Sequence, residues 1–349
     1  MKRTLTILLA ALFLLACYVP VSAADWDLYG SARMATFWTD ASEELGDDTQ
    51  LDHSLQGNSR IGAHVDAGAI GGRFEYGTGV NTRLLYGTFD VGPGQLLVGQ
   101  HYTPYGLGSF ISTQVYGGDA GMLQFMGYNG RVPMVQYSYN NFDFALVQPQ
   151  TPGFFDIAPG DETDGNPEVL LPQIAARYSE SFNGVSLDIA GVFQTYELQE
   201  LNDETLTAWG LTANATLNMM DPFYVSFGGF FGQNVAHFGQ WSIVDSTASV
   251  DLANNSIEDT DTYGLLLVLG TQFNGIAVQG GAGYVASENS DWTEDDETIA
   301  YYLQAKIPMT DAGNAFIMPE IGYYDYRDDN TGADAGDDFY VGLQWRVDF

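Results

Sequence analysis

The stretch DDFYVGLQWRVDF, at positions 337–349, decides the fold. Every second residue in it is apolar, so one face of the segment carries Phe339, Val341, Leu343, Trp345, Val347 and Phe349. A period of two is typical of a β-strand with one apolar face. The same alternation recurs at 54–67 and 185–196, so the chain is predicted to be rich in β-strands.

The connections between predicted strands alternate in length. Tight-turn sequences occur at Gly92-Pro93-Gly94, Asn140-Asn141, Asn183-Gly184, Asp221-Pro222 and Asn274-Gly275, and longer polar connections fall between them. Short turns at one rim and long loops at the other are typical of a membrane β-barrel. The pattern predicts an all-β fold with about sixteen antiparallel strands. They are placed near 25–39, 54–67, 71–79, 82–91, 94–103, 131–139, 142–148, 171–181, 184–196, 204–218, 222–235, 261–273, 275–287, 296–308, 314–326 and 337–349. An even number allows the first and last strands to pair and close the sheet, because an open edge cannot survive in hydrocarbon.

The first 24 residues are predicted to be a secretory signal peptide, and 25–349 the barrel. A basic start is followed by an apolar run, and cleavage is placed after Ala23 or Ala24. An alternative is a lipoprotein cleavage box in which Cys17 is lipidated. Cys17 is the only cysteine, so the mature chain is expected to hold neither a disulfide nor a thiolate metal site.

The chain is strongly acidic, with 45 Asp and Glu against 11 Lys and Arg and a net charge of −34. This charge argues against nucleic acid as a partner, because phosphates would be repelled. The acids gather in the predicted loops near 40–53, 288–297 and 328–338. These loops are hydrated rims in the simplest interpretation, and a loosely bound Ca²⁺ or Mg²⁺ beside lipopolysaccharide is the alternative. No other cofactor and no specific metal site are expected.

The two ends of the predicted barrel resemble known outer-membrane proteins. The last strand, with its terminal aromatic residue, looks like the final strand of bacterial outer-membrane proteins, and LYGSARMATFWTD at 28–40 resembles the first strand of general porins. The resemblance implies sixteen strands, periplasmic turns, extracellular loops, a place in the outer membrane of a Gram-negative bacterium among lipid and lipopolysaccharide, and a homotrimer. It also implies that Phe349 is a signal for the barrel-assembly machinery.

General porins fold their third long loop into the lumen, and the candidate for this constriction loop is 104–130. Asp119 is its only acid, whereas constriction loops of general porins usually carry several. The second connection, near 79–82, is only a tight hairpin. Porins commonly use that loop to hold a neighbouring subunit, so this departure leaves the trimer contact open.

Strand parity places six basic residues on inward faces: Arg33, Arg60, Arg73, Arg177, Lys306 and Arg346. Together with Asp119 these are the candidate pore-lining residues. Inward arginines facing an acid such as Asp119 across a pore would screen solutes by charge and dipole. The alternative is that they pair with inward Asp66, Glu75, Asp188 or Glu320 and stiffen the wall, since a charge facing lipid costs about 2–4 kcal/mol at mid-depth. Arg83 and Arg131 lie near strand ends, and Arg327 is also ambiguous, so parity leaves their direction open.

The favoured function is a water-filled channel for passive diffusion of small hydrophilic solutes and ions. A negative mouth favours mild cation preference, which inward arginines oppose. The alternatives are a solute-selective channel and a non-conducting surface barrel. No enzymatic activity is expected, because none of the four histidines lies in a recognisable catalytic pattern.

Overall fold

A computed structural model describes residues 24–46, 48–151, 155–158, 161–163, 166–251 and 256–349. The predicted signal peptide, including Cys17, lies outside the described residues except for Ala24. Within the described chain, no helix is both long enough and apolar enough to cross a bilayer.

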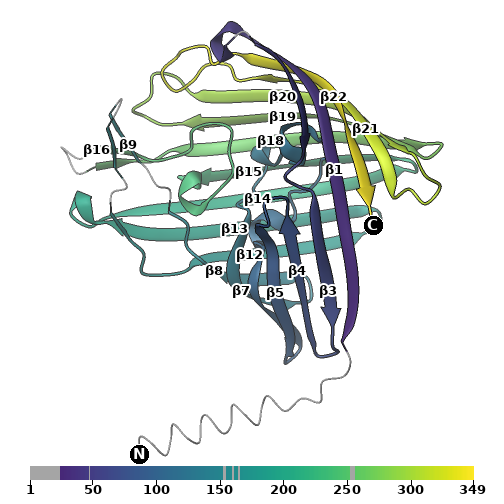
Figure 1. The fold of residues 1–349 in the computed structure, drawn as a ribbon. Coiled ribbons are helices and arrows are strands. Elements are labelled where there is room, and N and C mark those ends of the chain that lie inside the picture. Colours follow the sequence, from purple (N-terminus) through teal and green to yellow (C-terminus); the bar gives the residue numbers. More distant parts are fainter. Residues whose placement is uncertain (1–23, 47, 152–154, 159–160, 164–165, 252–255) are drawn as a thin grey trace, which may run out of the picture.

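The chain forms one closed barrel of sixteen antiparallel strands, as predicted (Figure 1). Because one of the sixteen is interrupted, each of these wall positions is called a stave here, whether it holds one strand or two. Fifteen staves are single strands: β1 (Asp25–Ala41), β4 (Ile70–Gly77), β5 (Thr82–Val91), β6 (Gly94–Tyr102), β7 (Arg131–Tyr139), β8 (Phe142–Val147), β12 (Gln173–Phe182), β13 (Val185–Leu198), β14 (Glu204–Met220), β15 (Phe223–Gln233), β18 (Asp261–Phe273), β19 (Ile276–Glu288), β20 (Asp296–Pro308), β21 (Ala315–Asp325) and β22 (Asp337–Asp348). The remaining stave is split into β2 (Thr49–Leu55) and β3 (Arg60–Asp66). The smaller elements are η1 (Glu43–Leu45), β9 (Phe155–Ala158), β10 (Asp161–Thr163), β11 (Pro167–Glu168), η3 (Gln199–Leu201), β16 (Ser249–Asp251) and β17 (Ser256–Glu258).

The barrel closes where β1 meets β22. The two strands pair from Ser31 opposite Asp348 to Ala41 opposite Asp338. At the end of the ladder the Phe349 N–H donates to the Gly30 carbonyl at 3.0 Å, and the Gly30 N–H donates to the Phe349 carbonyl at 2.6 Å. The final residue therefore takes part in the closing ladder.

The second stave differs from the single strand predicted at 54–67. Its lower part, β3, pairs with β1 from Asp25 to Ser31, and its upper part, β2, pairs with β1 from Met34 to Asp40. Four residues, 56–59, stand opposite two in β1 and form an inward bulge. The Gln56 N–H still donates to the Arg33 carbonyl at 2.9 Å. Bulges of this kind redirect side chains, and this one brings residues 56–59 toward the lumen.

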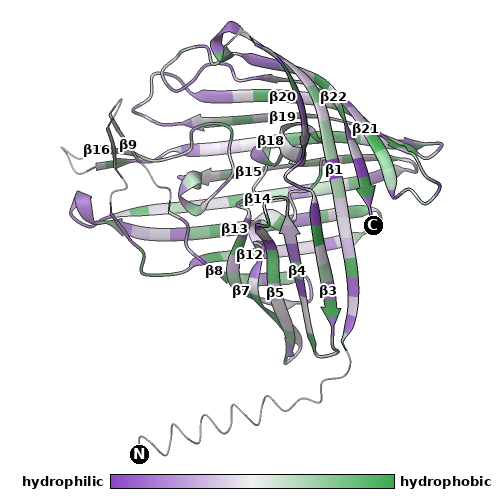
Figure 2. Cartoon of the chain, viewed as in Figure 1, coloured by the Kyte–Doolittle hydropathy of each residue, from purple (hydrophilic) through white to green (hydrophobic). Residues whose placement is uncertain are grey.

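The two faces of the wall have opposite character. In β18, Leu265, Leu267 and Leu269 are exposed, whereas Leu266 and Val268 are buried. Figure 2 shows the same alternation along the other strands. Apolar side chains thus cover the outside of the barrel. Two long connections between strands occupy part of its interior.

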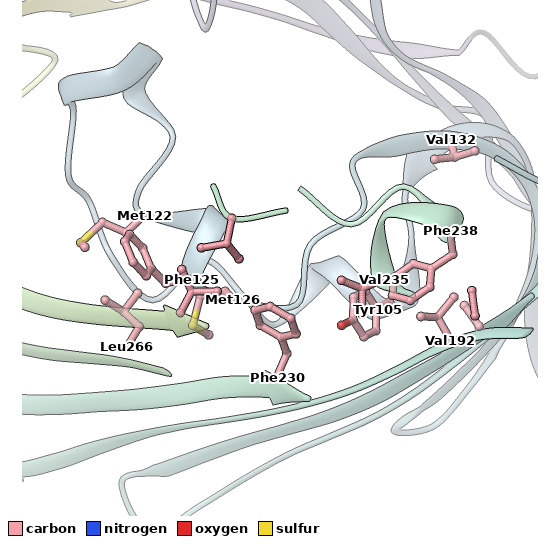
Figure 3. Packing of buried hydrophobic residues seen from close by; sticks show 14 of the residues in the cluster. Tyr105, Met122, Phe125, Met126, Val132, Val192, Phe230, Val235, Phe238 and Leu266 are labelled. Carbon is pink, nitrogen blue, oxygen red and sulfur yellow. The ribbon is translucent and has the colours of Figure 1, made fainter. Parts of the chain in front are cut away.

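These two connections are named here loop L3 (residues 103–130, between β6 and β7) and loop L6 (residues 234–260, between β15 and β18). Loop L3 contains α2 (Pro104–Leu107), α3 (Tyr116–Asp119) and η2 (Leu123–Phe125), and loop L6 contains η4 (Val235–Phe238). Figure 3 shows side chains of both loops packed against the inner face of the wall, with Met122, Phe125 and Met126 beside Phe230 and Leu266.

Candidate functional site

Loop L3 lies close against the wall because glycines leave room for it. A β-carbon on Gly283 of β19 would lie 2.7 Å from the Phe125 ring. A β-carbon on Gly264 of β18 would lie 2.7 Å from the Phe125 carbonyl oxygen, and one on Gly228 of β15 would lie 2.7 Å from the end of Met126. The three glycines lie on adjacent staves and face inward. Side chains at these three positions would collide with loop L3, so the glycines allow the loop to lie against the wall.

The tip of loop L3 is held by one buried carboxylate. Glu320 of β21 accepts the Val115 N–H at 2.8 Å and the Tyr116 N–H at 2.9 Å. It also accepts a hydrogen bond of 2.6 Å from the side chain of Gln304, whose amide in turn donates to the Thr113 carbonyl. Because its two oxygens accept three hydrogen bonds, two of them from the backbone of loop L3, Glu320 is the main polar anchor of the tip.

Aromatic contacts complete the attachment of the tip. The Tyr116 ring stacks on Tyr340 with centroids 3.8 Å apart, and its hydroxyl donates to Asp338 at 2.6 Å. Ser112 and the Tyr302 hydroxyl lie 2.7 Å apart. The loop is thereby joined to β20, β21 and β22, and its far end points across the lumen toward β1.

Asp119 does not face an arginine across open space. Its carboxylate forms a salt bridge with Arg33 of β1, and the two side chains keep less than a tenth of their surface exposed. The Asn58 amide, in the bulge of the second stave, donates to the Asp119 carbonyl at 2.7 Å. Loop L3 therefore crosses from β19–β22 to β1 and is attached at both sides.

A second carboxylate, Glu75 of β4, forms ion pairs with three arginines. Arg83 lies 2.6 Å away, Arg73 3.1 Å and Arg60 3.6 Å, measured between the charged atoms. Glu75 has 0% exposed surface. The sequence placed Glu75 among the inward acids that could stiffen the wall, but it left Arg83 ambiguous because Arg83 lies near a strand end.

The loops leave a cavity of about 770 Å³ open in the lumen. Six cationic side chains line it, and Asp119 is the only carboxylate in the lining. The cationic residues are Arg33, Arg60, Arg83, Arg131, Lys306 and Arg346.

The structure brings five of the seven candidate residues to this cavity: Arg33, Arg60, Asp119, Lys306 and Arg346. Arg73 is not in the lining but is joined to it through Glu75. Arg177 lies in a separate cavity of about 580 Å³ on the other side of loop L3, where it pairs with Asp143 and Asp188. A role in selectivity stays a prediction for all seven.

Loop L6 contacts loop L3 and holds it in place. The sequence did not predict this contact. The Gln240 side chain donates to the Met126 carbonyl at 2.7 Å and accepts the Tyr128 N–H at 3.1 Å. The Trp241 N–H donates to the Tyr128 carbonyl at 2.8 Å. The available signal was the number of apolar residues in this connection, among them Val235, Phe238, Trp241, Ile243 and Val244.

His237 secures loop L6 inside the barrel. Its ring contacts the Tyr196 hydroxyl, and its Nε2 accepts the Ala248 N–H at 3.0 Å. Burial lowers the pKa of His237 to about 3, so the ring is uncharged at neutral pH and its Nε2 can accept. This histidine therefore has a structural role.

No group of three His, Cys, Asp or Glu side chains in the described chain is placed to hold a metal ion. A loosely bound Ca²⁺ or Mg²⁺ at the acidic loops stays a prediction.

No family model and no curated protein match the chain. Solved structures do match it. The outer membrane channel DcaP of Acinetobacter baumannii has a TM-score of 0.73 and 16% identity, over 93% of this chain and 97% of that one. The trimer form of OmpT, an outer membrane protein of Vibrio cholerae, has a TM-score of 0.56 and 14% identity, over 94% of this chain and 100% of that one. An anion-selective porin from Comamonas acidovorans has a TM-score of 0.58 and 11% identity, over 93% of this chain and 100% of that one. At these identities the likeness shows the fold, which is the general porin-type fold of Gram-negative outer-membrane barrels.

Proposed function

We propose that this outer-membrane barrel is a water-filled channel through which small hydrophilic solutes and ions diffuse passively. The barrel is closed and has an apolar outer face, and its interior keeps a cavity of about 770 Å³ between loop L3 and the wall. Polar and charged side chains line that cavity, which supports an aqueous path.

The charge of the path supports a preference for anions. The total charge of −34 favours cations, but most of the acids lie in the long loops and at the strand ends beside them. The cavity has six cationic side chains and one carboxylate in its lining. Lys306 lies 3.9 Å from the Phe316 ring centroid, and Arg131 lies 5.5 Å from that of Tyr102, so their charges are held by rings rather than cancelled by carboxylates in the described chain. In a narrow pore the nearest charges act most strongly on a passing ion.

Conductance in a planar bilayer tests both parts of the proposal. Purified, folded protein is expected to give discrete conductance steps, and its reversal potential in a KCl gradient is expected to show chloride preference. A potassium preference would overturn the anion proposal and restore the preference expected from total charge. The absence of conductance steps would overturn the channel and favour a non-conducting surface barrel.

We also propose that the chain forms a homotrimer, with β2 covered by a neighbouring copy. All seven residues of β2 are exposed, and its register pairs are with β1 alone among the described strands. A free strand edge leaves backbone groups unsatisfied in hydrocarbon. On the outer face, Thr36 Oγ1 and His53 Nδ1 lie 2.8 Å apart between the exposed Leu51 and Leu55. A polar pair there fits a protein neighbour better than lipid, and OmpT, one of the matching structures, is described as a trimer.

Cysteine cross-linking locates the contact. Cys17 is the only cysteine of the sequence and lies in the predicted signal peptide, so a single introduced cysteine can be followed. Leu51→Cys, treated with a bifunctional maleimide in mild detergent, is expected to give cross-linked copies. Leu267→Cys, on the exposed outer face of β18, is the matched control and is expected to stay monomeric on a denaturing gel. Equal cross-linking of the two variants would contradict this placement of the interface.

A further inference from the structure

Four aromatic side chains meet on one wall of the cationic cavity. They are Tyr102 at the end of β6, Phe110 and Tyr128 in loop L3, and Trp241 in loop L6, and all four are in its lining. The Phe110 ring meets Tyr102 edge-on, with centroids 5.2 Å apart, and meets Tyr128 at 5.7 Å. Trp241 follows at 6.3 Å from Tyr128. We name this group the aromatic wall.

Two members of the aromatic wall expose apolar surface to the lumen. Phe110 is 49% exposed and Trp241 is 44% exposed. Both belong to loops inside the barrel, so their exposed surface does not meet the membrane. Other large apolar side chains of loop L3, such as Phe125, are fully buried against the barrel wall. Packing of the loop accounts for Phe125 but not for the free faces of Phe110 and Trp241.

Guanidinium groups stand beside the aromatic wall. Arg131 lies over the Tyr102 ring at 5.5 Å from its centroid, and its Nη1 donates to the Tyr102 hydroxyl at 3.3 Å. Arg60 and Arg83 line the same cavity. A carboxylate can take two parallel hydrogen bonds from a guanidinium, and a planar ring gains from contact with aromatic faces and edges.

We infer that the aromatic wall and its arginines form a binding subsite for aromatic carboxylates, which are anions with a planar, apolar body. This inference rests on the proposed anion-preferring channel and narrows its solutes. An exposed Phe and Trp would be of no use to a hydrated inorganic anion. They match a solute whose charge faces Arg131 and whose ring faces Phe110 and Trp241. Few convergent charged groups beside apolar surface are typical of ligand sites.

Current block with two matched probes tests the subsite. Benzoate and cyclohexanecarboxylate have the same charge and six ring carbons, but only benzoate is planar and aromatic. Benzoate is expected to block the chloride current of the wild-type channel at lower concentration. Phe110→Leu and Trp241→Leu are each expected to weaken block by benzoate about threefold and to leave cyclohexanecarboxylate nearly unchanged. Arg131→Gln is expected to weaken both probes.

Phe231→Leu is the matched control, because Phe231 is an exposed aromatic on the outer face of β15. It is expected to retain wild-type block by both probes. Equal block of the wild-type channel by benzoate and cyclohexanecarboxylate would overturn the subsite, as would Phe110→Leu and Trp241→Leu variants that behave like the control. If the channel prefers chloride but shows equal block by the two probes, or variants that behave like the control, only the subsite is refuted. A channel that prefers potassium refutes the proposed function as well.

Discussion

Glu320→Gln is expected to release the tip of loop L3 and make the open-channel current markedly noisier. Glu320 accepts three hydrogen bonds, from Val115, Tyr116 and Gln304. A glutamine amide has one oxygen, and its NH₂ group would face an N–H donor, so at least one backbone contact is lost. Each hydrogen bond lost costs about 0.5–1.5 kcal/mol. Single-channel recording of the variance of the open current measures the effect.

Glu204→Gln is the control for this prediction. Glu204 is exposed at the start of β14, so the variant removes the same charge without touching loop L3. The variance of its open-channel current is expected to equal that of the wild type. If the Glu320→Gln channel were no noisier than the Glu204→Gln channel, Glu320 would not be the anchor of the tip.

Glu75→Gln is expected to lower stability and to strengthen anion preference at the same time. The substitution leaves Arg60, Arg73 and Arg83 without the carboxylate that they share. Removing one partner of a buried ion pair costs about 3–5 kcal/mol, and the lower value applies because Arg60 and Arg73 are partly exposed, at 19% and 25%. The loss of one negative charge beside the cavity moves the reversal potential further toward chloride.

Thermal unfolding in detergent and reversal potential in a KCl gradient measure the two effects of Glu75→Gln. Glu288→Gln, at the exposed end of β19, removes the same charge outside the cavity and is expected to change neither. A Glu75→Gln protein with wild-type stability would contradict the role of Glu75 as the shared partner of the arginines. Unchanged reversal potential would contradict its electrical effect on the path.

Local sequence patterns were sufficient to predict the strands that form the barrel wall. Alternation and turn sequences predicted sixteen strands, and the structure has sixteen staves. The break at 56–59 was not predicted, because Gln56 and Ser59 continue the alternation of their neighbours. That break depends on distant partners. Gln56 donates to the Val115 carbonyl, and Ser59 accepts the Arg33 N–H.

The interior was harder to predict. Inward placement of Arg33, Arg60, Arg73, Arg177, Lys306 and Arg346 followed from strand parity, which depends only on positions along one strand. Their partners lie far along the chain, as with Arg33 and Asp119, which are 86 residues apart. Arg83 and Arg131 lie near strand ends, where parity alone left their direction open, and both line the cavity.

The terminal strand shows where sequence alone suffices. The period of two in 337–349 determined an outward apolar face, because successive side chains of any strand point to opposite sides. What only the tertiary structure decided is which charged side chains line the cavity. Net charge sums residues regardless of position, whereas the field on a passing ion depends on distance. The fold leaves most acids in the long loops and at the strand ends beside them and places six cationic side chains around one cavity, so the lining of that cavity does not follow the net charge of −34.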